Sequence, residues 1–521
     1  MCGIVVSQTK SIDLEKSSKL LQRRGPDQHR KWVQDGFQFY FNRLAIMGLN
    51  ASGMQPFILG GHVLAANAEI YNEHALREKV AYHVFTSGSD CEVLLPLYLT
   101  YGFDMFSMLD AEFAMVIYDA NKNTLIAARD HLGIRPLFYG YDQESHHIVF
   151  ASEAKALISM VDHVLPCPPG HYYDGQTWIR YHQDWSKIKP DQFDQDTILT
   201  SIRDLLTDAV KKRMHADAKI GYLLSGGLDS SLVCAIAQRH QQEKIETFSI
   251  GMDTDPIDLK YARRVASFLG TNHHEVIMHK AEVIAALDEV IYALESYDTT
   301  TVRASIGMFL LSKYIHQETD IKALLTGEVS DELFGYKYTD FAPSKEAFQQ
   351  EEIKRLHELY MYDVLRADRC LAFHSLEARV PFGDKAFVDY IVSIDPTLKM
   401  NRTGIGKHLL RKAFEGDYLP HDILYREKAA FSDAVGHSMV DHLKAHANIA
   451  YDDETFILRS QTYSPKPRTK EALLYREIFE KHYPNHSHLI KEYWMPNKDW
   501  EGCNVDDPSA RFLKNYGKSG E

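Results

Sequence analysis

The sequence predicts two domains of different fold class: an α+β domain with antiparallel sheets, followed by an α/β domain with a parallel sheet and additional helices. The chain has 521 residues, more than a single hydrophobic core usually organises. In its first third, alternating apolar and polar segments flank turn-forming clusters, a pattern typical of hairpins. From residue 220 onward, segments of strand and helix character alternate, which indicates a parallel sheet.

The individual elements follow from the same patterns. Hairpins are expected over 113–128, 137–151 and 171–181. The polar stretch 184–196 is interpreted as a linker, so the domains are expected to span 1–190 and 191–521, with about the last ten residues disordered. In the second domain, strands are expected at 244–250, 274–278 and 321–326, and helices at 230–240, 259–269, 281–295 and 407–414.

Composition and charge argue against several classes of partner. A net charge of −14 disfavours nonspecific nucleic-acid binding, which depends on a cationic surface. No apolar run is long enough to span a membrane, and no charged-then-apolar leader precedes the body, so a cytoplasmic location is expected. The six cysteines are scattered without a Cys-x-x-Cys pair, which indicates reduced thiols rather than disulfides or a zinc site.

Two weaker patterns are interpreted as structural. The histidine-rich segment 273–279 misses the His-Glu-x-x-His spacing and falls on an expected strand, where helical spacing does not apply. The segment with Gly404 and Gly406 lacks the third glycine of a dinucleotide-binding fingerprint, so it is interpreted as a turn before a helix.

Cys2 is the first candidate catalytic residue. Removal of Met1 would put a thiol and an α-amino group on one residue. A thiolate is the attacking species in sulfur chemistry, and an α-amino group with a pKa of roughly 7.7 to 8.0 is a base suited to neutral pH. Cys2 could therefore supply both nucleophile and base, although a cysteine at this position means little without companions.

The companions of Cys2 occur in order along the first third of the chain. They lie in the segments 23–27, 42–46, 67–72 and 87–92, and together these segments resemble the class II glutamine amidotransferase domain. The resemblance implies an αββα sandwich of the Ntn-hydrolase type, in which two antiparallel sheets are stacked. It also implies that glutamine is the first substrate.

Each companion suits a step of amide hydrolysis. An oxyanion needs positioned donors, which the Asn67 side chain and the Ala68 backbone N–H could provide. The resemblance assigns Asn67, Arg43, Glu69 and Asp90 to glutamine binding, as partners of its carboxylate and ammonium groups. Ala68 stands where the family usually has glycine, which keeps the donor but restricts φ and leaves the rate of glutamine hydrolysis open.

A second motif lies at 220–231. An apolar run ends in Ser225-Gly226-Gly227-Leu228-Asp229-Ser230, after which a helix is expected. Small residues at a helix N-terminus present N–H groups to phosphates. The motif is not a Walker A loop and resembles the pyrophosphate loop of ATP pyrophosphatases. This resemblance implies an ATP site at Leu224, Ser225, Gly226, Gly227, Asp229, Ser230, Ile250, Thr326 and Gly327.

The segment 326–332 follows an expected strand and resembles the Ser-Gly-Glu-Gly-Ser-Asp-Glu segment of asparagine synthetases. Acidic residues at a triphosphate site would repel the triphosphate unless a divalent cation lies between them. Mg²⁺ typically binds one or two carboxylates plus phosphate oxygens. Asp229 and Asp331 are the candidate Mg²⁺ ligands. As a solvated acidic loop, the segment would need no metal.

Further stretches at 295–305, 376–382, 427–433 and 506–509 extend the resemblance to glutamine-hydrolysing asparagine synthetases over essentially the whole chain. It implies aspartate and ATP as further substrates, ammonia carried along an enclosed path, and a cytoplasmic enzyme for which a homodimer is one possible state. The resemblance also implies that Glu328 and Lys428 take part directly in the synthetase reaction. The candidate residues for the acceptor site are Thr300, Arg303, Glu377 and Arg379.

Departures from the family pattern cluster near the expected acceptor site. Val329 replaces a glycine, Thr326 replaces a serine, and 429–430 are alanines where polar residues are usual. Two alternatives therefore stay open: an amidotransferase acting on another carboxylate, and a degenerate homologue that only binds nucleotide or glutamine. The presence of Cys2, Ser225, Asp229 and Asp331 argues against the second alternative.

Overall fold

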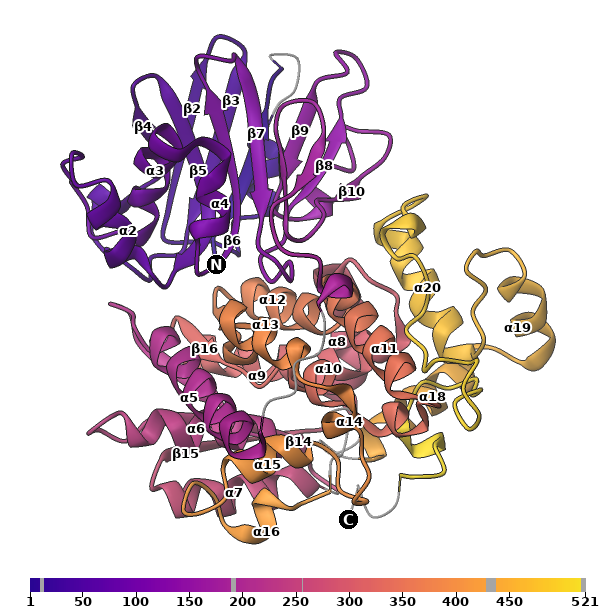
Figure 1. The fold of residues 1–521 in the computed structure, drawn as a ribbon. Coiled ribbons are helices and arrows are strands. Elements are labelled where there is room, and N and C mark those ends of the chain that lie inside the picture. The colour runs from indigo at the N-terminus through magenta and orange to yellow at the C-terminus, as the bar shows by residue number, and fades with distance from the viewer. Residues whose placement is uncertain (10–13, 189–193, 255, 428–436, 517–521) are drawn as a thin grey trace.

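A computed structural model describes residues 1–9, 14–188, 194–254, 256–427 and 437–516. The N-terminal sheets form one body, and a larger helical body with its own sheet lies beneath it in Figure 1. The N-terminus lies at the lower edge of the N-terminal sheets, facing the second body. The first residues of the chain are thus placed at the boundary between the two domains.

The N-terminal domain contains two stacked antiparallel sheets of six strands each. The first has the order β10 (Leu165–Pro166), β8 (Phe138–Tyr141), β9 (Ile148–Ala151), β1 (Gly3–Ser7), β3 (Phe37–Arg43) and β2 (Gln28–Gln34). The second has the order β12 (Trp178–Arg180), β11 (His171–Tyr173), β7 (Thr124–Arg129), β6 (Ala111–Asp119), β5 (His62–Ile70) and β4 (Phe57–Leu59). All three predicted hairpins are present.

Helices cover the outer faces of these two sheets. The first sheet packs against α1 (Leu14–Leu20), and the second packs against α2 (Glu73–Lys79), α3 (Leu94–Tyr101) and α4 (Met105–Met108). Between the sheets lies an apolar core to which Ile4, Phe39 and Val116 contribute. The alternation of inward and outward side chains along each strand produces this layering. The predicted αββα sandwich is confirmed.

The second domain contains a five-stranded parallel sheet. Its order is β15 (Asn272–Met278), β14 (Glu246–Met252), β13 (Ile220–Leu223), β16 (Ala323–Leu325) and β17 (Glu377–Arg379). The predicted parallel sheet is confirmed, with β14, β15 and β16 at the expected places. The edge strand β17 was not predicted, because three residues give no periodic signal.

Helices surround this sheet and form the rest of the second domain (Figure 1). Four of them match predicted helices: α6 (Leu228–Arg239), α7 (Ile257–Leu269), α8 (Lys280–Leu294) and α15 (His408–Ala413). The other α-helices within the described part of this domain are α5 (Gln195–Arg213), α9 (Thr299–Glu318), α10 (Ser330–Phe334), α11 (Lys345–Glu358), α12 (Asp363–Phe373), α13 (Lys385–Ser393), α14 (Pro396–Lys399), α16 (His421–Leu424), α18 (His437–Ala450), α19 (Asp453–Ser460) and α20 (Lys470–His482).

The segment interpreted as a linker is described at both of its ends, 184–188 and 194–196. Trp185 within it is buried, and its indole Nε1–H donates to Asp389 Oδ1 at 2.8 Å. The predicted domain boundary at 190 lies outside the described residues. At the other end of the chain, Leu513 is buried, whereas 517–521 lie outside the described residues.

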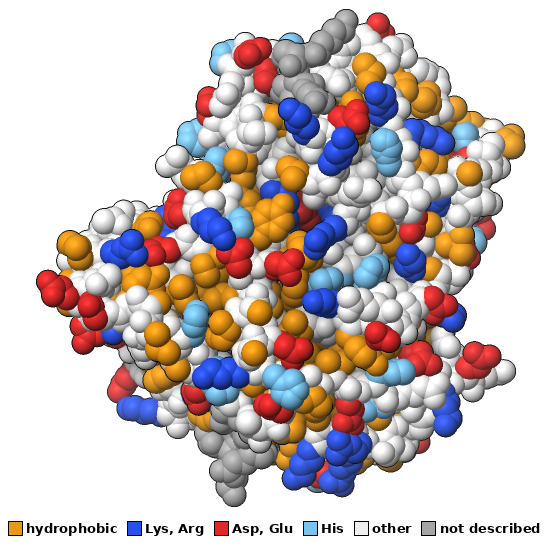
Figure 2. All heavy atoms as spheres, turned by 180° about the vertical axis from the view of Figure 1, so that it is seen from behind, with side chains coloured by type: hydrophobic (Ala, Val, Ile, Leu, Met, Phe, Trp, Pro, Cys, Tyr) orange, Lys and Arg blue, Asp and Glu red, His pale blue; other side chains and the backbone are white. Residues whose placement is uncertain are grey.

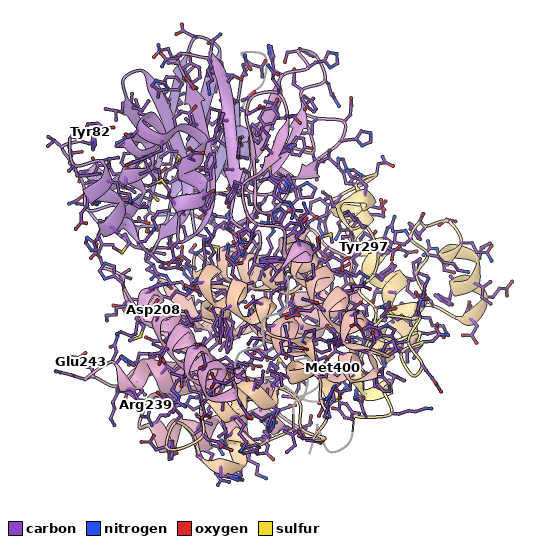
Figure 3. The ribbon with its side chains drawn as sticks, in the orientation of Figure 1. Tyr82, Asp208, Arg239, Glu243, Tyr297 and Met400 are labelled. Atoms are coloured by element: carbon purple, nitrogen blue, oxygen red, sulfur yellow. The ribbon has the colours of Figure 1, made fainter. Side chains whose placement is uncertain are left out.

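Buried ion pairs join the two domains. Arg24 of the first domain contacts Glu153 of its own domain at 2.7 Å and Asp368 of α12 at 2.8 Å. On the other side of the boundary, Arg213 of α5 contacts Glu112 of β6 at 2.9 Å. Asp208, labelled in Figure 3, lies near this end of α5, close to the N-terminal sheets. Each buried charge therefore meets an opposite charge, as burial requires.

The outer surface carries mixed charge. Acidic and basic side chains are scattered over the face seen in Figure 2, with hydrophobic side chains between them. Among the helices of the described residues, none combines the length and the apolar character needed to cross a lipid bilayer.

Asp368→Asn should weaken the contact between the domains. The substitution keeps the side-chain size but leaves Arg24 to share Glu153 with Arg369 and Lys155. Breaking a buried ion pair costs about 3–5 kcal/mol. We expect the variant to begin unfolding at a clearly lower urea concentration than the parent protein. Tryptophan fluorescence monitors this unfolding.

The matched control is Asp288→Asn, which removes a half-exposed carboxylate that contacts Lys481 at 2.7 Å. Exposed pairs contribute about 0–1 kcal/mol, so this variant should unfold nearly as the parent does. Equal behaviour of the two variants would contradict the role given to Asp368.

Candidate active sites

The first pocket gathers the predicted glutamine-site residues at the bottom of the N-terminal sheets. It encloses about 30 Å³, and its lining includes Cys2, Arg43, Asn67, Ala68, Glu69, Asp90 and Glu377. Cys2 precedes β1, Arg43 ends β3, and 67–69 are consecutive residues near the end of β5. The strand ends thus bring residues that are distant in the sequence to one place.

Asn67 is placed as a donor beside Cys2. Its Oδ1 accepts a hydrogen bond from the Cys2 backbone N–H at 2.8 Å, which fixes the direction of the side-chain amide. Its Nδ2 is buried and has no hydrogen-bond partner among the residues that the structure describes. A buried donor without a partner is costly unless a ligand completes it. Asn67 Nδ2 is therefore available to an oxyanion formed next to the Cys2 thiol.

Ala68 fits its position without backbone strain. It lies within β5, where the backbone is extended, and it is not among the residues with positive φ. Since only a positive φ would favour glycine, the methyl group carries no conformational cost there. The departure from the family pattern at Ala68 leaves the backbone donor intact.

The charges of the first pocket complement an amino acid. Backbone carbonyls of Met47 and Asn50 accept hydrogen bonds from the buried Arg43 guanidinium at 3.2 and 2.8 Å. Among the described residues Arg43 forms no ion pair, so its charge can serve a ligand carboxylate. Burial raises the pKa of Asp90 to about 6 and also raises the pKa of Glu69.

Met1 lies at the domain boundary. It is fully buried, and it belongs to an apolar cluster formed mainly by the second domain. Its amino group is 3.7 Å from Glu377 of β17, and burial lowers the pKa of this amine to about 6. The residue next to Cys2 is therefore already in contact with the second domain.

The second pocket lies at the carboxyl ends of β13, β14 and β16 and encloses about 210 Å³. Twelve of the predicted residues line it: Leu224, Ser225, Gly227, Asp229, Ser230, Ile250, Thr300, Arg303, Thr326, Gly327, Glu328 and Asp331. In proteins with an open parallel sheet, ligands bind at the carboxyl ends of the strands. The segment Pro508–Ala510 also lines the pocket, close to the end of the described chain.

The loop after β13 has the geometry of an anion site. Gly226 has a φ of +73°, and a Cβ there would lie 2.4 Å from the Ala262 backbone nitrogen, so only glycine fits. Gly227 caps α6, a helix of 12 residues, whose first N–H groups point out of the helix toward the pocket. Ser225 and Ser230 are joined by a hydroxyl contact of 3.0 Å that fixes the turn.

The two carboxylates predicted to hold a metal converge on one cation of the protein. Lys407 Nζ lies 2.7 Å from Asp229 Oδ1 and 2.5 Å from Asp331 Oδ1. It also donates to Ser330 Oγ at 2.9 Å. The side chain is almost fully buried, and Lys407 itself has a left-handed φ of +59°. Asp229 and Asp331 thus form a preferred place for positive charge.

Glu328 also lines the cavity and lies against a cation. Arg366 Nη2 donates to Glu328 Oε2 at 2.5 Å, and Asp363 contacts the same guanidinium at 3.0 Å. Burial raises the pKa of Glu328, and the nearby Arg366 acts in the opposite direction. Burial also raises the pKa of the neighbouring Glu332 well above its usual range.

The four acceptor-site candidates separate into two pairs. Thr300 and Arg303 line the second pocket. Thr300 Oγ1 is buried without a partner, whereas the Arg303 guanidinium is bound by Glu471 at 2.8 Å and Asp507 at 2.9 Å.

Glu377 and Arg379 are not brought to that cavity. They lie on one face of β17, because alternate residues of a strand point the same way, and this face meets the first pocket. Lys428 lies outside the described residues.

Comparison with known proteins follows the same division of the chain. Residues 1–167 match the family description "Glutamine amidotransferase domain", and residues 201–347 and 340–505 match "Asparagine synthase". A probable glutamine-hydrolyzing asparagine synthetase of Acanthamoeba polyphaga mimivirus is 42% identical over 98% of this chain and 100% of its own length. The glutamine-hydrolyzing asparagine synthetase of Mus musculus is 40% identical over 99% of both chains.

This chain belongs to the asparagine synthetase family. The two pockets can accordingly be called the glutaminase pocket, around Cys2, and the synthetase cavity, around the 225–230 loop. The family assignment predicted from the motifs is confirmed.

Sequence reasoning missed several charged residues of the synthetase cavity. Lys407 follows Gly404 and Gly406, which were interpreted only as part of a turn. Arg366 lies in α12, whose sequence contains no recognisable motif. Arg411 and Arg426 also line the cavity. None of these residues has a spacing that indicates phosphate or acceptor binding, because they come from separate elements that only the fold brings together.

Val329, one of the residues that depart from the asparagine synthetase pattern, has a strained backbone. It has a φ of +79°, is 2% exposed and lines the synthetase cavity. Burying a valine side chain contributes about 1.5–3 kcal/mol, whereas a left-handed conformation costs about 1–2 kcal/mol for a residue with a Cβ. The two effects are similar in size and opposite in sign.

Val329→Gly should therefore be at least as stable as Val329→Ala. Both substitutions lose the buried methyl groups, but only glycine relieves the backbone. The melting temperatures of the two variants, measured by circular dichroism, test this order.

Val233 provides the matched control. It is buried in the middle of α6, where glycine costs about 1 kcal/mol relative to alanine. Val233→Gly should melt below Val233→Ala. The same order at both positions would contradict the strain assigned to Val329.

Proposed function

We propose that the protein is a glutamine-dependent asparagine synthetase. It converts ATP, L-aspartate, L-glutamine and water into AMP, pyrophosphate, L-asparagine and L-glutamate. The observation that carries the proposal is the presence of both pockets in one chain. In the first, Asn67 Nδ2 lies beside Cys2 without a partner among the described residues, and the second contains the phosphate-type loop at 225–230. The names and full-length similarity of the relatives support the same activity.

At the glutaminase pocket, the Cys2 thiolate attacks the side-chain amide carbon of glutamine. The carbonyl oxygen becomes an oxyanion that Asn67 Nδ2 and the Ala68 N–H stabilise, each donor contributing about 2.7–4 kcal/mol. The C–N bond then breaks, ammonia leaves, and water hydrolyses the thioester to glutamate. The Cys2 α-amino group, freed by removal of Met1, carries the proton between these steps.

Recognition of glutamine uses the charges of the same pocket. The Arg43 cation, which has no ion-pair partner among the described residues, receives the α-carboxylate. Glu69 and Asp90 receive the α-ammonium group. This arrangement selects an amino acid that carries both charges, because its carboxylate meets the Arg43 cation and its ammonium group meets the two carboxylates.

At the synthetase cavity, an oxygen of the aspartate β-carboxylate attacks the α-phosphorus of ATP. The bond to pyrophosphate breaks, which leaves a β-aspartyl-adenylate. Ammonia then attacks the β-carbonyl carbon, AMP leaves, and one proton is released. Glu328 lies in this cavity beside Arg366 and is the proposed group that steers adenylate formation and ammonia attack. Lys428 is proposed to offset the charge of the leaving phosphates.

The donor set of the cavity fits Mg²⁺. Asp229 and Asp331 already converge on the ammonium group of Lys407, so their field favours a cation. Two carboxylates together with phosphate oxygens and water complete the usual coordination sphere of Mg²⁺. Bound there with ATP, Mg²⁺ would neutralise charge on the phosphates. Asp229 and Asp331 would hold it, and Ser330 would orient Asp229 through its hydroxyl donor at 2.7 Å.

The remaining assignments rest on chemistry and on the family. Aspartate is proposed as the acceptor, with the unpartnered Thr300 and Thr326 hydroxyls available to it. A reducing, cytoplasmic location suits the six cysteines, which are all free thiols. No nucleic-acid or membrane partner is proposed, and the homodimer stays a prediction.

Cys2→Ala tests the division of labour. The variant should make no asparagine from glutamine, while synthesis from added ammonium chloride continues at close to the parental rate. With aspartate labelled by ¹⁸O in the β-carboxylate, one label should appear in AMP in both proteins, as measured by mass spectrometry. This transfer occurs because the carboxylate oxygen becomes bonded to the α-phosphate.

Loss of both activities in a folded Cys2→Ala protein would contradict two separate sites. If a panel of other carboxylates produced labelled AMP and aspartate did not, the acceptor would be a different acid. Absence of pyrophosphate release with every carboxylate would support the alternative of a protein that only binds its ligands.

Asp229→Asn tests the metal site without relying on turnover. The variant should bind a non-hydrolysable ATP analogue at least tenfold more weakly in the presence of Mg²⁺, measured by calorimetry, because one proposed ligand charge is lost. Glutamine hydrolysis at Cys2 should continue. Asp208→Asn, a change at an exposed carboxylate of α5, serves as the control. Equal Mg²⁺-dependent affinity in both variants would remove Asp229 from the site.

A further inference from the structure

The strand β17 of the synthetase domain reaches into the glutaminase pocket. Glu377 lines that pocket, and Arg379, two residues later on the same face, contacts Glu69 of β5. Arg379 Nη2 lies 2.8 Å from Glu69 Oε1. The two residues belong to different domains, so one side of the glutamine site is built by the synthetase half of the chain.

The Arg379 guanidinium is fixed in one orientation. The side chain is fully buried, and its Nη1 donates to the backbone carbonyls of Arg213 at 2.9 Å and His215 at 2.6 Å. Its Nε donates to Glu377 Oε1 at 3.1 Å. A planar guanidinium held at three points presents its remaining edge in a single direction. That edge meets Glu69.

Glu69 depends on this contact. Among the described residues, Arg379 is the cation that contacts its carboxylate directly. Burial and the neighbouring Asp90 and Glu377 raise the pKa of Glu69, whereas Arg379 and the more distant Arg135 lower it. Without Arg379 the ionised carboxylate would lose its nearest opposite charge, and its side chain would lose the group that fixes its direction.

Arg379 also contacts the other active site through its backbone. It pairs with Leu325 across β16 and β17, and its carbonyl oxygen accepts a hydrogen bond from the Thr326 N–H at 3.0 Å. Thr326 lines the synthetase cavity. One residue therefore contacts the wall of the ATP site with its main chain and the glutamine site with its side chain.

We propose that Arg379 is a positioning residue for glutamine: it holds the Glu69 carboxylate toward the substrate ammonium group, so that the glutaminase pocket is complete only when the synthetase domain is docked. The proposal rests on the proposed glutaminase activity. It concerns recognition of the ammonium group, and Arg379 touches neither the reacting amide nor Cys2.

The test measures ammonia release from two substrates, glutamine and glutaramate, which is glutamine without its α-ammonium group. Arg379→Gln should raise the KM for glutamine roughly tenfold or more, equivalent to about 1.4 kcal/mol. The kcat should change little, and kcat/KM for glutaramate should stay near the parental value. The preference for glutamine over glutaramate should therefore fall, and Arg379→Lys should restore part of it.

Arg369→Gln is the matched control. Arg369 is an equally buried arginine at the domain boundary, and it contacts Glu295 at 2.9 Å and Glu153 at 3.3 Å but no residue of the glutaminase pocket. Loosening the domains through Arg369 should reduce activity toward both substrates alike, without changing their ratio.

An equal loss of activity toward both substrates in Arg379→Gln would show a merely structural role and would overturn the proposal. If that variant does not fold, Glu69→Gln and Arg379→Lys provide the same comparison, and an unchanged substrate ratio in both would overturn it. The double variant Arg379→Lys/Glu69→Gln should be no less selective than Glu69→Gln alone. Absence of glutamine hydrolysis in the unmodified protein would instead contradict the proposed function itself.

Discussion

Charges buried at the domain boundary have to find opposite charges, because water no longer solvates them, and several of these partners come from the other domain. Arg24 contacts Asp368, Arg213 contacts Glu112, and Arg379 contacts Glu69. Separating the domains would leave each of these groups without its partner unless water replaced it. The relative position of the glutaminase pocket and the synthetase cavity is therefore fixed by electrostatics as well as by apolar packing.

This requirement explains why residues of one domain can serve the site of the other. The face of β17 that carries Glu377 and Arg379 points toward the first domain, and the same short strand forms the edge of the nucleotide-binding sheet. A shift of β17 would move the glutamine site and the strand beside Thr326 together. The two reactions share a structural element even though their pockets are separate.

The parts of the site that are contiguous in sequence could be predicted, and those assembled from distant elements could not. Asn67 and Glu69 fall within one strand, and Ser225 to Ser230 form one loop and the start of the helix that follows it, so local patterns located them. Lys407 could not be found in this way, because its role depends on meeting carboxylates from two other elements. The fold classes were predictable because they follow from repeated periodicity, whereas the three-residue strand β17 depends on long-range pairing.

The synthetase cavity is closed by one of the last segments of the described chain. Asp507 holds Arg303, and Pro508–Ala510 form part of the cavity wall. During synthesis on the ribosome, the glutaminase sheets and the phosphate loop emerge long before this segment does. The nascent chain can thus form its N-terminal sheets first, but the glutaminase pocket lacks Glu377 and Arg379 until β17 has emerged, and the synthetase cavity stays open to solvent until translation has passed residue 510.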